Sequence, residues 1–252
     1  MRVLAVFVVL FCPTFTPAAE PLVAVAANLA HPIQSLATDF TRESGTRVRL
    51  TIGSSGDLLR QIQQGAPYEI YIAAATSYTG RAQAENLTVG EPVVLARANL
   101  GAFIPYGSEL ESATDLTALG RLLSAGEYRR IAMANPEVAP FGAAAQQALR
   151  MMGVWALERD RLILGENLAQ AVQFTLAGGV DVGFIAESYA MMPEVSTHGR
   201  FLPIDNSWHD PLAQTMVILR GAGEEARAFF AFLQSAAARE LLSKSGYTVP
   251  AP

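Results

Sequence analysis

The chain has 252 residues and a formal net charge of −5, a length that allows one large domain or two lobes with sizeable cores. Hydrophobic residues make up 51% of the sequence and charged residues 16%, which excludes an intrinsically disordered protein. An acidic chain with few lysines and arginines argues against nucleic acid and against an anionic membrane surface as a partner.

The first nineteen residues differ in composition from the rest of the chain. Arg2 precedes an apolar run from Val3 to Phe11, and small residues close the segment at Ala18 and Ala19. This order predicts a secretory signal peptide over residues 1–19. The apolar run is too short to cross a membrane as a helix, and no later segment is both apolar and long enough.

The single cysteine, Cys12, lies inside this segment. Cleavage after Ala19 would leave a mature chain without cysteine, which suits an oxidising compartment without the use of disulfides. Lipidation of Cys12 is an alternative reading, but bulky Phe11 stands where a small residue is expected.

Strand-like and helix-like segments alternate through the rest of the chain. Apolar segments predict strands at Leu22–Ala26, Val48–Ile52, Ile70–Ala74, Arg130–Ala134, Leu162–Leu164, Val182–Ile185 and Met216–Leu219. The segment Pro92–Pro105 contains a longer apolar run, Val93–Ala96 followed by Leu100–Ile104. Apolar residues at helical spacing predict helices at Leu29–Glu43, Leu58–Gln64, Phe141–Met152, Leu168–Ala177 and Glu224–Ser243. Repeated units of this kind predict an α/β fold with mostly parallel sheets flanked by helices.

Ligands of such sheets bind beyond the carboxyl ends of the strands, at the loops that open the helices. The most informative of these loops is the corner Gly53-Ser54-Ser55-Gly56, between a predicted strand and a predicted helix. Its composition exposes backbone N–H groups and hydroxyls at the positive end of a helix dipole, which suits an anion.

Three further loops open predicted helices at strand ends. In two of them Asn28 and Asn167 are the expected helix N-caps, and in the third Pro140 suits the first helical position and Gly142 permits close backbone approach. None of the four loops carries a lysine or arginine. Each cap alone is ordinary helix chemistry, so only convergence of the four on one spot would indicate a site.

The residues in these loops resemble the periplasmic molybdate-binding proteins of ABC transporters. The resemblance runs from about Leu22 to Val249, and its most specific parts are the segments Gly53–Ala74 and Asn135–Gly142. It implies a two-lobed periplasmic binding protein fold of type II, with a hinge and a ligand cleft between the lobes. Lobe 1 is expected in residues 20–98 and 201–252, and lobe 2 in residues 99–200.

The resemblance also implies the ligand and its donors. Family members hold molybdate or tungstate as a dehydrated tetrahedral oxyanion, with no cofactor and no metal bound directly by side chains. The partners implied are this small oxyanion and a membrane permease, for a monomer located in the periplasm. The residues expected to line the site, through hydroxyl or backbone N–H donors, are Ala27, Asn28, Ser54, Ser55, Phe141 and Leu168.

Two positions depart from the commonest family pattern. Many members have a serine where Asn28 lies and a tyrosine where Ala186 lies. A subset lacks this tyrosine and has an asparagine in the first loop and an aromatic–glycine pair in the third, which Asn28 and Phe141-Gly142 match. An asparagine amide can donate like a hydroxyl, so a fully neutral donor set is expected, while the choice of oxyanion stays open.

Other functions are also consistent with parts of the sequence. A binding protein for sulfate, phosphate or a carboxylate is one alternative, although a carboxylate binder would normally bring an arginine for bidentate contact. A serine hydrolase would need Ser54 or Ser55 to pair with His31, and the chain has no Gly-x-Ser-x-Gly elbow. A transition-metal site at His209-Asp210 lacks ligand spacing.

Overall fold

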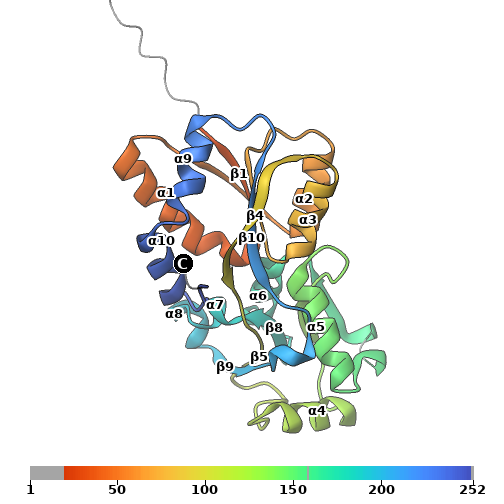
Figure 1. Cartoon of the computed structure of the whole chain (residues 1–252). Helices are drawn as coiled ribbons and strands as arrows, with labels where there is room; N and C mark the ends of the chain where they lie inside the picture. Colours follow the sequence, from red (N-terminus) through yellow and green to blue (C-terminus); the bar gives the residue numbers. More distant parts are fainter. Residues whose placement is uncertain (1–19, 158, 251–252) are drawn as a thin grey trace, which may run out of the picture.

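The structure is a computed structural model that describes residues 20–157 and 159–250. The predicted signal peptide at residues 1–19, with Cys12, lies outside the described residues. The described chain forms two lobes, each built on one five-stranded sheet (Figure 1).

The first sheet has the strand order β2-β1-β3-β10-β4. β1 pairs in parallel with β2 and β3, whereas β10 is antiparallel to both of its neighbours. Four strands therefore share one direction and β10 is reversed. The strands are β1 (Leu22–Ala26), β2 (Arg49–Gly53), β3 (Ile70–Ala73), β4 (Thr88–Arg97) and β10 (Ala213–Leu219).

The second sheet repeats this plan with the order β7-β6-β8-β5-β9. Here β5 is the reversed strand, antiparallel to β8 and β9, while β6 pairs in parallel with β7 and β8. The predicted α/β fold with two mostly parallel sheets is therefore confirmed. The strands are β5 (Leu100–Pro105), β6 (Ile131–Ala134), β7 (Leu162–Gly165), β8 (Val182–Ala186) and β9 (Gly199–Pro203).

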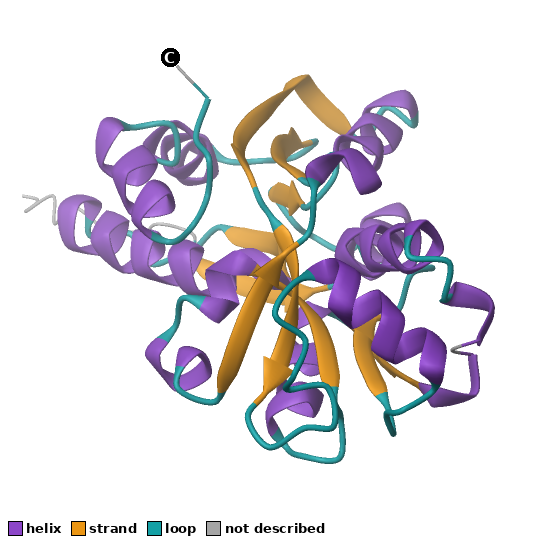
Figure 2. Cartoon of the chain, turned by 90° about the horizontal axis from the view of Figure 1, so that it is seen from below, coloured by secondary structure: helices purple, strands orange, loops and turns teal. Residues whose placement is uncertain are grey.

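Helices cover both faces of the sheets (Figure 2). The first lobe has α1 (Ala30–Ser44), α2 (Ser55–Gln63), α3 (Thr76–Ala84), α9 (Glu224–Phe232) and α10 (Ala236–Lys244). The second has α4 (Leu116–Ala125), α5 (Pro140–Met151), α6 (Leu168–Leu176), α7 (Glu187–Ala190) and α8 (Pro193–Ser196). Short 3-10 turns are η1 (Ala27–Leu29), η2 (Trp155–Leu157), η3 (Arg159–Arg161) and η4 (Asn206–Trp208).

The side-chain alternation of the strands explains this layering. Successive residues of a strand point to opposite faces of the sheet. Val23 and Val25 of β1 share a buried cluster with Phe40 of α1, whereas Ala24 belongs to a second cluster with Leu58 of α2. Because both faces are buried, the central strands are continuous apolar runs.

The chain crosses between the lobes twice, from β4 to β5 and from β9 to β10. The first crossing lies near Ala98, where lobe 1 was expected to end. The expected boundary between residues 200 and 201 falls inside β9, and Phe201 pairs with Phe103 of β5. The second sheet therefore continues to Pro203.

The prediction of one long helix over Glu224–Ser243 is wrong, because the segment forms two helices, α9 and α10. The second helix starts anew because the Ser235 hydroxyl accepts the N–H of Ala238 at 3.2 Å, which is an N-cap. The apolar spacing continues through the break, so the periodicity alone does not reveal it. The helices α3, α4, α7 and α8 were not predicted.

A buried carboxylate anchors the start of β8. Asp181 accepts hydrogen bonds from the Arg129 N–H at 2.5 Å and the Arg129 guanidinium at 3.0 Å. Burial raises the pKa of Asp181, but the hydrogen bonds from Arg129 outweigh it, so the net shift is downward. A lowered pKa in the folded state stabilises the fold above the unfolded pKa near 3.8.

We expect Asp181→Asn to lower the free energy of unfolding at pH 7 by roughly 1–3 kcal/mol, because the hydrogen bonds that Arg129 donates lose their buried charged acceptor. The wild type should become less stable as the pH falls below about 4, and the variant should show a smaller decrease over the same range. Urea unfolding between pH 3 and 7 measures both effects. Asp39→Asn, at a surface pair with Arg42, is the control and should change stability by less than about 1 kcal/mol.

Candidate functional site

A narrow cavity lies where the loops after β1, β2, β6 and β7 meet. Its volume is about 10 Å³, close to one water-sized sphere, so the lobes in this arrangement leave no room for an organic ligand. All six residues predicted for the site line it. The lining residues are Ala26, Ala27, Asn28, Gly53, Ser54, Ser55, Ala74, Ala139, Pro140, Phe141 and Leu168.

At the start of α2, some hydrogen-bond donors bind acceptors within the protein and others are left free for a ligand in the cavity. Asp57 N–H donates to the Ser54 Oγ at 3.1 Å, and that hydroxyl donates to the Asp57 carboxylate at 2.6 Å. Gly56 N–H donates to the carbonyl of Val138 at 2.8 Å. The Ser54 hydroxyl and two N–H groups are therefore engaged. The N–H of Ser55, at the first helical position, has no intrahelical acceptor and is left for a ligand.

Two contacts fix Ser55 so that its hydroxyl proton stays available. Ala74 N–H donates to the Ser55 Oγ at 3.1 Å, and the Tyr71 hydroxyl donates to the Ser55 carbonyl at 2.6 Å. Burial raises the pKa of Tyr71 well above its ordinary value, so this phenol remains a donor. Ser55 can then donate through both its hydroxyl and its N–H to a ligand.

The second lobe adds the starts of two helices. Pro140 takes the first position of α5, as predicted, so Phe141 carries the first N–H of that helix. In α6 the Asn167 Oδ1 accepts the Gln170 N–H at 3.2 Å, which confirms the predicted N-cap. Leu168 N–H is then left at the first helical position, without an intrahelical acceptor.

The structure corrects the expected capping role of Asn28. This residue lies inside the turn η1, and its side chain caps no helix. Its amide nitrogen donates to Gln214 Oε1 at 2.7 Å and to the Tyr247 hydroxyl at 3.3 Å. An amide nitrogen has two N–H groups, so both have protein acceptors. The backbone N–H is the donor that Asn28 can offer to the cavity.

Two tyrosine hydroxyls hold the carbonyls of the first loop. Tyr247 donates to the Asn28 carbonyl at 2.6 Å, and Tyr189 of α7 donates to the Ala27 carbonyl at 2.9 Å. Burial raises the pKa of Tyr247 to about 12. Sequence reasoning missed both tyrosines and Gln214, because each reaches the first loop from a distant element and no local pattern marks it.

Ala186, the position where the resemblance leads one to expect a tyrosine, is buried at the end of β8. Tyr189 follows three residues later, but its hydroxyl binds the Ala27 carbonyl. Tyr189 therefore does not replace the absent donor.

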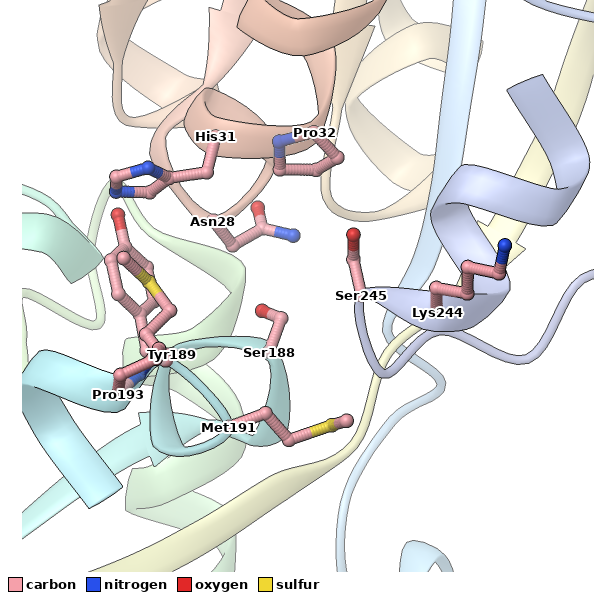
Figure 3. Close-up of a pocket in the computed structure, with 10 residues that line it drawn as sticks. Asn28, His31, Pro32, Ser188, Tyr189, Met191, Pro193, Lys244 and Ser245 are labelled. Carbon is pink, nitrogen blue, oxygen red and sulfur yellow. The ribbon is translucent and has the colours of Figure 1, made fainter. Parts of the chain in front are cut away.

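A second cavity, of about 240 Å³, lies beside Asn28 (Figure 3). His31 lines it, with its ring edge-on to Tyr189 at 5.9 Å between centroids. Lys244 also lines it and pairs with Glu240. His31 and Ser55 thus line different cavities, and among the described residues no hydrogen bond joins Ser55 to a histidine.

The described residues offer little support for a metal site or a membrane helix. His209 Nδ1 lies 2.8 Å from the Asp210 carbonyl, and within residues 20–157 and 159–250 no group of three His, Cys, Asp or Glu side chains could hold a metal ion. None of the helices in that part of the chain is long and apolar enough to cross a membrane.

Fold and site together define a two-lobed binding protein with its cavity between the lobes. The family model for bacterial extracellular solute-binding proteins matches residues 21–248. The chain belongs to this family.

Known relatives agree with this assignment. The chain is 31% identical over 233 residues to the molybdate-binding protein ModA of Azotobacter vinelandii, covering 91% of this chain and 90% of the relative. It is 30% identical to the molybdate-binding protein ModA of Rhodobacter capsulatus, with 91% and 88% covered.

Solved structures match along the same length. The periplasmic molybdate-binding protein of Azotobacter vinelandii superposes with a TM-score of 0.82 at 25% identity, covering 92% of this chain and all of that chain. The sulfate-binding protein SubI of Mycobacterium tuberculosis has a TM-score of 0.71 at 15% identity, covering 92% and 87%. The second likeness shows the fold alone.

We expect Tyr247→Phe to lower the free energy of unfolding by roughly 1–3 kcal/mol, because the buried Asn28 carbonyl loses its donor. Tyr106→Phe, at a side chain that is 60% exposed, is the matched control and should change stability by no more than about 0.5 kcal/mol. Urea unfolding of both variants measures the difference, and equal stabilities would contradict the anchoring role of Tyr247.

Proposed function

We propose that this chain captures molybdate or tungstate outside the cytoplasm and delivers it to the permease of an ABC importer. The observation that carries the proposal is the convergence of Ser55, Phe141 and Leu168 on one narrow cavity. These residues open helices in both lobes. The named function of the Azotobacter and Rhodobacter relatives supports the choice of ligand.

The cavity suits an anion, although its lining contains no charged side chain. A buried dianion is costly to desolvate unless it is fully hydrogen-bonded. Each charge-assisted hydrogen bond contributes on the order of 1.5–3 kcal/mol, and each helix N-terminus adds about 0.3–1 kcal/mol. Several such donors together can offset the desolvation cost, and no lining carboxylate repels the anion.

The donor set also favours a fully deprotonated ligand. Ser55, Phe141 and Leu168 line the cavity at helix starts, where their N–H groups have no intrahelical acceptor. A protonated phosphate would instead need an acceptor for its own proton. Sulfate has no such proton but is smaller than molybdate and tungstate. The choice of molybdate or tungstate over sulfate is therefore supported by the named relatives and not by the cavity volume, and molybdate and tungstate are too similar for the cavity to separate.

We infer from the same features that the chain is not an enzyme and uses no cofactor. Ser55 lacks the histidine partner that a nucleophilic serine needs, and the metal would arrive as its oxyanion. The proposed form is a periplasmic monomer, released by cleavage of residues 1–19. The periplasmic assignment is supported by the matched Azotobacter structure.

Calorimetric titration of ligand-free protein with molybdate, tungstate, sulfate and phosphate tests the proposal. Molybdate and tungstate should bind with similar affinity, and sulfate and phosphate should bind at least about tenfold more weakly, which is 1.4 kcal/mol. Equal or tighter binding of sulfate would contradict the proposed ligand.

The two serines of the corner allow a sharper test. Ser55→Ala should weaken molybdate binding by roughly 1–3 kcal/mol, because an anion oxygen loses a donor. Ser54→Ala removes the N-cap of α2, so it should lower stability by about 1 kcal/mol and affect affinity less. Calorimetry and thermal unfolding of both variants separate these effects, and a larger affinity loss in the Ser54 variant would reverse the assignment.

A further inference from the structure

Three hydrogen bonds join the lobes beside the cavity: the Tyr247 hydroxyl bonds the Ser188 hydroxyl at 3.2 Å, and the other two engage backbone atoms of loops that line the cavity. Gly56 N–H at the start of α2 donates to the Val138 carbonyl before α5, at 2.8 Å. The Tyr189 hydroxyl of α7 donates to the Ala27 carbonyl before α1, at 2.9 Å. In each pair one residue comes from the first lobe and the other from the second.

The two bonds that engage backbone atoms lie on opposite flanks of the molecule. α2 and α5 are on one side in Figure 1, and α1 and α7 are on the other. Figure 3 shows Tyr189 extending from its short helix towards the start of α1, where His31 and Asn28 lie. The lobes are therefore held at both edges of the interface that contains the cavity.

Position 56 has no space for a side chain when the lobes are in contact. A Cβ atom there would lie 2.9 Å from the Val138 carbonyl oxygen and 3.0 Å from its Cα. The three nearest atoms all belong to Val138 of the opposite lobe. The closest obstacle to a side chain at position 56 is therefore the second lobe.

Both bonds share a backbone loop with a proposed ligand donor. Gly56 follows Ser55 at the start of α2: the Gly56 N–H donates to Val138, and Ser55 lines the cavity. Ala27 precedes Asn28 in the first loop, and both line the cavity. The same two loops therefore make the contact between the lobes and line the cavity for the ligand. Contact between the lobes then orders the backbone that would bind the ligand.

We propose that Gly56 and Tyr189 are positioning residues that hold the lobes together over the bound anion. The identity of that anion rests on the proposed function. Since the residues that line the cavity are buried, apart from the half-buried Gly53, the lobes must separate for the ligand to enter or leave. Breaking either bond should then speed release of the ligand without altering the fold of either lobe.

Gly56→Ala is the direct test, with Gly80→Ala as its matched control. Gly80 lies in α3 of the same lobe, and a Cβ there would meet no atom within 4 Å. We expect Gly56→Ala to weaken molybdate binding roughly 10- to 100-fold, mainly through faster dissociation, because the added methyl overpacks the interface. Gly80→Ala should leave the affinity within about twofold. Both variants should melt no lower than the wild type, since alanine favours a helix.

Tyr189→Phe tests the hydrogen bond between Tyr189 and the Ala27 carbonyl. It tests the proposal independently, even if the Gly56→Ala variant is unstable. Loss of the hydroxyl should weaken binding about 3- to 10-fold, with Tyr106→Phe as the control without effect. Lobe separation can be followed by energy transfer between dyes on Gln64→Cys and Ser124→Cys, because the chain after residue 19 contains no cysteine of its own. Molybdate should shorten this distance less in Gly56→Ala than in the wild type.

The two proposals fail separately in this experiment. A wild-type chain that binds no molybdate contradicts the proposed ligand. A wild type that binds and closes, together with Gly56→Ala and Tyr189→Phe variants of unchanged affinity, release rate and lobe distance, contradicts the positioning roles. An equal loss of affinity in Gly80→Ala would also overturn the role of Gly56, because the effect would not depend on Val138.

Discussion

The proposed site depends on one constraint, which is that a buried anion must be fully hydrogen-bonded. Each of the three helix starts at the cavity has N–H groups without intrahelical acceptors. The protein fills some of these itself, through the Ser54 and Asn167 caps and the Gly56–Val138 bond. What remains is one leading N–H at each of Ser55, Phe141 and Leu168, and all three residues line the same small cavity. In the proposed site, the N-caps and the Gly56–Val138 bond thus determine which N–H groups are left to bind the ligand.

The sheets bring these donors together. In each lobe the parallel strands end at one edge, so the loops after β1 and β2 meet those after β6 and β7 across the interface. The lining of the cavity comes from both lobes. A ligand held by both lobes favours the arrangement in which they touch, which links binding to closure. The tyrosines that hold the first loop keep its backbone in place at that interface.

The sequence predicted the residues that line the cavity better than the residues that hold those loops in place. The residues that start a helix follow local rules, so Ser55, Pro140 and Asn167 could be recognised from their neighbours in the sequence. That their loops meet at one place was predicted only from the family resemblance. The side chain of Asn28 was misassigned because its partners, Gln214 and Tyr247, are far away in the chain. The break between α9 and α10 was missed because the apolar period continues across it. Long-range hydrogen bonds and interlobe contacts leave no periodic pattern, so they could not be predicted.

Diffraction from crystals grown with molybdate, recorded at the molybdenum absorption edge, tests the central claim most directly. The account predicts one strong anomalous peak between the helix starts at Ser55, Phe141 and Leu168, within hydrogen-bond reach of their N–H groups. A peak in the larger cavity beside His31 and Lys244, or no peak in crystals of well-folded protein, would contradict it.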